Sequence, residues 1–180
     1  SLPSLRKKVA EINSILQNKY HFKLKVTPIS IIGDERDIRF FFAQYFHEAY
    51  GYFKWPFTDS REDIEEFVAF FIKMTEFPAS YANLLQIQTQ IAVNLHRYKN
   101  GATIDTMSDS SNELPLYSHL SEYQDQLEPL AKRLNIKINR ETLEQLFDSY
   151  TQKGIFFTVE KFLGARPLKK EVDPSYHAAR

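Results

Sequence analysis

The chain of 180 residues contains no cysteine, which excludes disulfide bonds and thiolate metal sites. Only five glycines are present, and scarce glycine argues against a turn-rich β-sandwich and favours helices. No apolar run approaches the roughly 18 residues that a membrane-spanning helix needs. The opening residues show no signal-peptide pattern. From these absences we expect an intracellular protein.

The short motifs of catalysis and cofactor binding are also missing. The chain has no His-x-x-x-His pair for zinc, no Glu-x-x-His pair for a di-iron bundle, no Gly-x-Ser-x-Gly turn and no glycine-rich phosphate loop. A run of carboxylates falls in the first turns of an expected helix, where capping and the helix dipole explain it. These are Glu62, Asp63, Glu65 and Glu66. We therefore predict no catalytic residue, no metal ligand and no cofactor, and we lean against an enzyme.

The formal net charge is zero, which argues against a chain that binds nucleic acid or an anionic membrane along its whole length. The charges are nevertheless segregated. Residues 1–27 carry six basic side chains and one acidic side chain, a net charge of +5. Residues 34–76 carry ten acidic and five basic side chains, a net charge of −5. Such blocks either attract one another within the fold or steer a charged partner.

What the sequence does contain is a crowd of ten aromatic side chains between Phe40 and Phe57. One helix face cannot bury that many rings against a single neighbour. We therefore expect this segment to lie at the centre of the fold, or to present part of its surface to a partner.

Apolar periodicity and capping residues predict six or seven helices. The expected helices cover about residues 2–20, 34–50, 60–75, 78–100, 120–134 and 139–150. Asp34, Ser60 and Asn139 are the expected N-terminal caps, and Gly51 is an expected helix end. Pro129 should kink or split its helix. The helix that ends near Gly101 has a polar, uncharged side, which is one of the features that favour an interaction module: Gln86, Gln88, Gln90 and Asn94.

Strand signals are few. Phe22–Val26 alternates strictly, and Asn135–Asn139 looks like a second short strand, so the two could pair into a β-ribbon. Residues 155–163 fit either a strand or a helix. Residues 133–163 could thus form a winged-helix-like C-terminal part, and residues 102–115 a loop.

The fold class that we predict is mainly α: a single helical domain of six to seven helices with a minor β-ribbon. The domain should cover residues 1–164, with a subdivision near residues 101–116. Residues 165–180 should form a tail or linker to the rest of a longer parent protein.

The function favoured by these features is a non-catalytic protein–protein interaction or adaptor module of a larger protein. Aromatic side chains are enriched at interfaces because they bring large contact area at low entropic cost. The loop after the aromatic helix is the predicted partner-binding site, made of Tyr52, Phe53, Trp55 and Phe57. The competing interpretation, which we favour for the loop itself, is that it packs back over the helices as a plug stiffened by Pro56.

The first alternative is a nucleic-acid-associated, winged-helix-like domain. It depends on a basic first helix and a basic tail, with Arg6, Lys7, Lys8, Lys169 and Lys170 as the contacting residues. Against it, the helix near residue 144 is acidic and would meet DNA with the wrong charge. The second alternative is an enzyme domain whose catalytic residues are dispersed along the chain.

Overall fold

The computed structural model describes residues 2–51, 53–75, 80–105 and 120–151. In chain order, the elements are α1 (Leu2–Tyr20), β1 (Phe22–Val26), β2 (Ile29–Gly33), α2 (Glu35–Tyr50), α3 (Arg61–Thr75), α4 (Tyr81–Lys99), α6 (Leu120–Arg133) and α7 (Arg140–Thr151). The prediction of a mainly α fold with a minor β-ribbon is confirmed: the described residues form six helices and one two-stranded antiparallel sheet. The ranges 155–163 and 165–180 lie outside the described residues.

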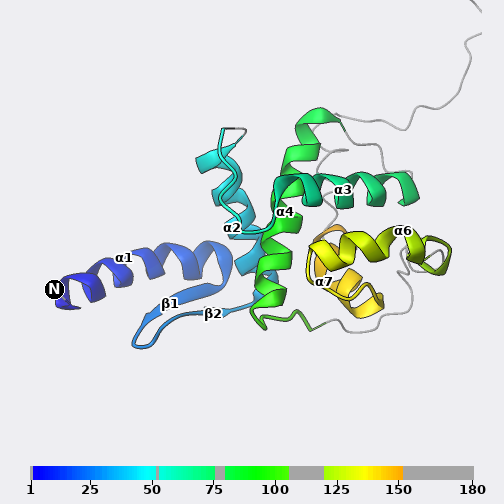
Figure 1. The fold of residues 1–180 in the computed structure, drawn as a ribbon. Coiled ribbons are helices and arrows are strands. Elements are labelled where there is room, and N and C mark those ends of the chain that lie inside the picture. Colours follow the sequence, from blue (N-terminus) through cyan, green and yellow to red (C-terminus); the bar gives the residue numbers. More distant parts are fainter. Residues whose placement is uncertain (1, 52, 76–79, 106–119, 152–180) are drawn as a thin grey trace, which may run out of the picture.

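Helix α4 forms the centre of the fold, with α2, α3 and α7 packed around it (Figure 1). Its Ile87, Ile91 and Leu95 are almost fully buried. They belong to one apolar core with side chains of α3, α6 and α7, among them Phe71 and Phe147, whose rings stack at 4.0 Å. A helix covered on several sides is apolar or neutral all round, which explains why α4 carries no charge between Tyr81 and Leu95.

The polar side of α4, one of the features that favoured an interaction module, is mostly inaccessible to a partner. Gln88, Gln90 and Asn94 are buried, with Asn94 fully inaccessible. Gln90 Nε2 donates to Asn94 Oδ1 at 2.9 Å, and Asn94 Nδ2 donates to the carbonyl oxygen of Leu146 in α7 at 2.7 Å. Amide side chains can be buried because their partners satisfy their hydrogen bonds without desolvating a charge.

Helix α1 and the hairpin β1–β2 extend away from the other helices (Figure 1). A smaller core of Leu16, Phe22 and Ile38 joins them to α2. The side chain of Asn13 fastens α1 to β1, because its Oδ1 accepts from the backbone N–H of Leu24 and its Nδ2 donates to the Leu24 carbonyl. The hairpin register pairs Phe22 with Gly33 and Val26 with Ile29.

The predicted partner of the first strand is wrong. Residues 135–139 form no strand; Phe22–Val26 pairs instead with Ile29–Gly33 across the turn at Thr27–Pro28. Closing a two-residue turn costs far less chain entropy than joining segments over a hundred residues apart. Residues 135–139 instead terminate α6: Asn135 has a positive φ of 51°, and the Ile136 N–H donates back to the Ala131 carbonyl at 3.0 Å.

The predicted helix ends agree with the structure where it describes them. Asp34 accepts from the N–H groups at the start of α2, Ser60 Oγ accepts from Asp63, and Asn139 Oδ1 accepts from Thr142. The helix α4 begins after Ser80, and Pro78 lies outside the described residues. Helix α6 runs unbroken through Pro129, so the expected split does not occur.

The aromatic helix α2 is not the centre of the fold. Its buried residues are Ile38, Arg39 and Ala43, so none of the aromatic side chains of α2 is buried. The rings instead pack on one another along the helix, as Phe42 does on Phe46 at 6.1 Å, while Phe40 and Tyr45 stay about half exposed.

Candidate nucleic-acid interface

The basic side chains of the first 33 residues all lie exposed on α1 and the hairpin. They are Arg6, Lys7, Lys8, Lys19, Lys23 and Lys25. Glu11 is the only acid in this stretch, so the unit carries a net charge of +5. Within the described part of the chain, none of the six is paired with a carboxylate. The unpaired basic charge is thus concentrated on the projecting unit, which we define as α1 and the hairpin, residues 2–33.

The two sides of α1 differ in chemistry. Leu16 and the half-buried Val9, Asn13 and Tyr20 lie on the side that packs on the hairpin and α2. At 100° per residue, the opposite side carries Lys7, Glu11, Ser14 and Asn18, with Lys8 and Ile15 beside them, all exposed. Lysine, serine and asparagine side chains hydrogen-bond to phosphates and to the edges of bases. The outer side of α1 is therefore mainly polar, carries two bases and one acid, and has no neighbour in the described structure.

A helix followed at once by a two-stranded hairpin is the arrangement expected for a winged helix. The sequence predicted that arrangement at residues 133–163; the described part of this range, to residue 151, contains no strand, and the predicted wing lies outside the described residues. A helix followed by a hairpin does occur at residues 2–33. This position also resolves the charge conflict, since residues 2–33 are basic whereas α7 carries Glu141, Glu144 and Asp148.

Behind this unit, α2 is tied to the helical body by a fully buried arginine. Arg39 Nη1 donates to the Gln145 carbonyl at 2.6 Å, and Nη2 donates to the Ala102 carbonyl at 2.7 Å. Its Nε donates to Glu35 Oε1 at 2.9 Å. Burial lowers the pKa of Arg39, because the cost of desolvation outweighs the hydrogen bond that Arg39 donates to the Glu35 carboxylate. A buried charge held by several acceptors fixes the position of α2 against α7.

Two further arginines complete the junction. Arg36 forms a two-pronged pair with Asp148 of α7, with Nε–Oδ2 at 2.8 Å and Nη2–Oδ1 at 2.9 Å, and this bond raises the pKa of Arg36. Arg97 of α4 holds Glu35 in the same way, with Nε–Oε1 at 2.9 Å and Nη2–Oε2 at 2.6 Å, which raises the pKa of Arg97. Paired planar groups of this kind add geometric precision to charge attraction.

The residues of the predicted partner-binding loop differ in their exposure. Tyr52 lies outside the described residues, and Phe53 is fully exposed. Trp55 and Phe57 are half-buried against the main core, with their rings 4.9 Å apart, and Trp55 Nε1 donates to the Asp59 carbonyl at 2.7 Å. Protein capture by this loop stays a prediction. Lys169 and Lys170 of the predicted nucleic-acid site lie outside the described residues.

Neither a metal-ligand cluster nor a membrane-spanning helix occurs among the described residues. No three potential ligands among them gather in one place. None of the described helices combines the length and the apolar character required to span a bilayer. His96 lies exposed beside Asn100, at the edge of a cavity lined by no carboxylate.

Comparisons with known proteins bear on the predicted functions. Residues 60–180 match the family model of the M protein trans-acting positive regulator (MGA) PRD domain, and residues 1–46 match that of the Mga helix-turn-helix domain. The chain belongs to the Mga family. A "Putative trans-acting regulator" of Streptococcus pneumoniae serotype 4 (strain ATCC BAA-334 / TIGR4) is 32% identical over 180 residues. The alignment covers 98% of this chain and 36% of that relative, so the chain spans about a third of the relative's length.

Membership of the Mga family supports the nucleic-acid alternative better than the adaptor interpretation. The Mga helix-turn-helix match takes in α1, the hairpin and most of α2, and the PRD match begins at the cap of α3. The arginines at 36 and 39 therefore join the two matched segments. Sequence reasoning missed them, because their partners lie more than sixty residues away. The (i, i+4) pair of Glu35 and Arg39 was the one local signal.

Proposed function

We propose that this chain is part of a DNA-binding transcription regulator, and that α1 and the hairpin β1–β2 form its DNA contact surface. The observation that carries the proposal is the exposed, unpaired charge of +5 on a projecting helix–hairpin unit in a chain of zero net charge. The Mga family matches and the name of the streptococcal relative agree with it. A regulator that contacts DNA works inside the cell, in line with the expected location.

The dimensions of α1 suit a groove of DNA. A helix of 19 residues is about 28 Å long, and the major groove admits one α-helix. The outer side of α1 would enter the groove, with Lys7, Ser14 and Asn18 facing base edges. Lys23 and Lys25 point from the hairpin strand next to α1 and would meet the phosphates alongside.

The test is the salt dependence of binding to duplex DNA of mixed sequence, measured by fluorescence anisotropy. Binding that uses phosphate contacts weakens with salt, with a slope of about 0.9 per contact on a log–log plot. The triple variant R6Q/K7Q/K8Q should lose roughly tenfold or more of its affinity at low salt, and its slope should fall by about two to three.

The matched control is K132Q/K137Q, which neutralises two exposed lysines at the end of α6 and just beyond it. This control should bind as the unchanged protein does. Absence of DNA binding at low ionic strength, or an equal loss in the control, would refute the proposed surface.

A further inference from the structure

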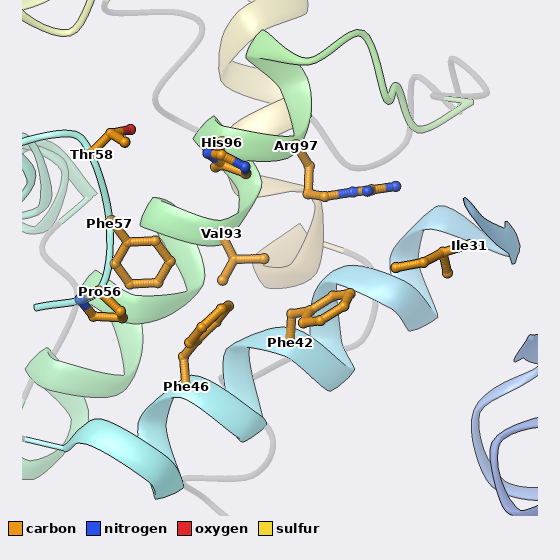
Figure 2. A pocket seen from close by; sticks show the side chains of 9 residues that line it. All are labelled: Ile31, Phe42, Phe46, Pro56, Phe57, Thr58, Val93, His96 and Arg97. Carbon is orange, nitrogen blue, oxygen red and sulfur yellow. The ribbon is translucent and has the colours of Figure 1, made fainter. Parts of the chain in front are cut away.

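A cavity of about 240 Å³ lies between α2, α4 and the loop that follows α2. Figure 2 shows Phe42 and Phe46 rising from α2 toward Val93 of α4, with Phe57 closing one side. His96 and Arg97, from the last turns of α4, stand at its edge. The cavity thus lies where the segment that matches the helix-turn-helix model meets the segment that matches the PRD model.

Most of the wall is apolar. The rings of Phe46 and Phe57 meet edge-to-face at 5.1 Å, and Phe42 packs on Phe46 at 6.1 Å. Val93 is buried behind them. At roughly 30 Å³ for each water-sized group, the space holds about eight such groups, the size of a small metabolite. Aromatic walls of this kind favour a flat or branched apolar body.

The edge of the cavity carries a positive charge that is only partly compensated. The single carboxylate of Glu35 serves two guanidinium groups, Arg39 and Arg97, so these three residues carry a net charge of +1. Arg39 is fully buried and its other partners are neutral oxygens, so it cannot receive an anion from solvent. Arg97 is about one quarter exposed.

Arg97 also has a donor to spare. Its Nε and Nη2 are held by Glu35, and Nη1 has no hydrogen-bond partner among the described residues. Glu35 fixes the guanidinium plane beside the cavity. A guanidinium that is already oriented loses little conformational entropy when it binds a carboxylate.

We propose that this cavity is a binding site for a small organic anion, namely a monocarboxylate with an aromatic or branched aliphatic body. The body fills the space between Phe42, Phe46 and Val93. The carboxylate lies at the edge and accepts from Nη1 of Arg97, which supplies the missing negative charge of the Glu35 cluster. This binding does not depend on the proposed DNA contact and can be measured without DNA.

The experiment is isothermal titration of the 180-residue chain with phenylacetate and 4-methylpentanoate, each compared with its uncharged amide. For ligands of about ten atoms or fewer we expect dissociation constants near 1 mM or tighter. Each carboxylate should bind roughly tenfold more tightly than its amide, since a charged hydrogen bond is about twice as strong as a neutral one.

Three variants locate the binding, and a fourth serves as the control. Arg97→Gln should raise the dissociation constant of the carboxylate to that of the amide while the amide still binds, which also reports that the cavity is intact. Val93→Trp fills the cavity and should abolish binding of both. If this variant does not fold, Thr58→Trp narrows the cavity from its exposed loop instead. Arg61→Gln, in a half-buried pair with Glu65 that lies outside the cavity lining, should change nothing.

The proposal is overturned if neither carboxylate shows saturable binding at ligand concentrations up to about tenfold the expected dissociation constant. Equal affinity for carboxylate and amide would refute the role of Arg97. Undiminished binding to both Val93→Trp and Thr58→Trp would place the ligand elsewhere.

Discussion

Replacing Arg39 by methionine should destabilise the whole chain, because that side chain holds α2 against α7. Methionine can occupy much of the space of the arginine stem, but it cannot donate to the Gln145 and Ala102 carbonyls or to Glu35. Breaking a buried, charged contact of this kind costs about 3–5 kcal/mol. The relief of desolvating one guanidinium offsets part of this, so we expect a loss of about 3 kcal/mol.

For a chain of this length, each kcal/mol moves the melting temperature by roughly 2–4 °C. Arg39→Met should therefore lower it by about 6–12 °C, measured by circular dichroism at neutral pH. Arg61→Met is the matched control, since Arg61 makes a half-exposed (i, i+4) pair with Glu65, and such helix pairs are worth only about 0.3–0.5 kcal/mol. The control should melt within about 2 °C of the unchanged protein.

A melting temperature for Arg39→Met as high as that of the control would refute the reasoning. It would mean that water or a neighbouring donor satisfies the two carbonyls, and that the charge of Arg39 contributes nothing net to stability.

Two further predictions concern the hairpin and the contact between α3 and α6. Gly33→Ala should speed hydrogen exchange in the hairpin but not in α4, because a Cβ there would lie 2.4 Å from Phe22 Cβ at a φ of +156°. Gly101→Ala, with open space around its Cβ, should have little effect on the hairpin, and equal effects would contradict the steric argument. Arg133 lowers the pKa of Asp63 through a hydrogen bond of 2.5 Å, so their pair stabilises the fold above the unfolded pKa of Asp63, about 3.9. In urea titrations, Arg133→Gln should therefore be less stable than the unchanged chain at pH 7, and the difference should shrink as the pH falls below about 4; a constant difference would argue against this pair.

Local chemistry made the helices predictable. Asp34 and Asn139 cap helices through contacts within three residues, and such contacts can be read directly from sequence. The apolar period of α4 likewise predicted its length. The environment of its polar side was not predictable, since an uncharged amide suits either solvent or a buried network, and the deciding partner, the Leu146 carbonyl, lies 52 residues beyond Asn94.

The hairpin shows a second limit on what the sequence could predict. The expected partner of Phe22–Val26 was residues 135–139, whereas its partner follows directly across the turn at Thr27–Pro28. The run from Ile29 to Ile32 was a usable signal, because a short β-branched segment directly after a turn favours a hairpin. The basic residues at 6, 7 and 8 were found from charge alone. Their relation to Lys23 and Lys25 required the fold.

The position of α2 has a consequence for attempts to divide the molecule. One helix supplies Ile38 to the core beneath the hairpin and Arg39 to the interior of the neighbouring bundle. Excising residues 1–46 as an independent unit would leave the guanidinium of Arg39 without its carbonyl acceptors. The remaining chain would lose the arginine that these carbonyls bind. We therefore expect that limited proteolysis or truncation will not separate residues 1–46 and 60–180, which the two family models match, into two independently stable parts.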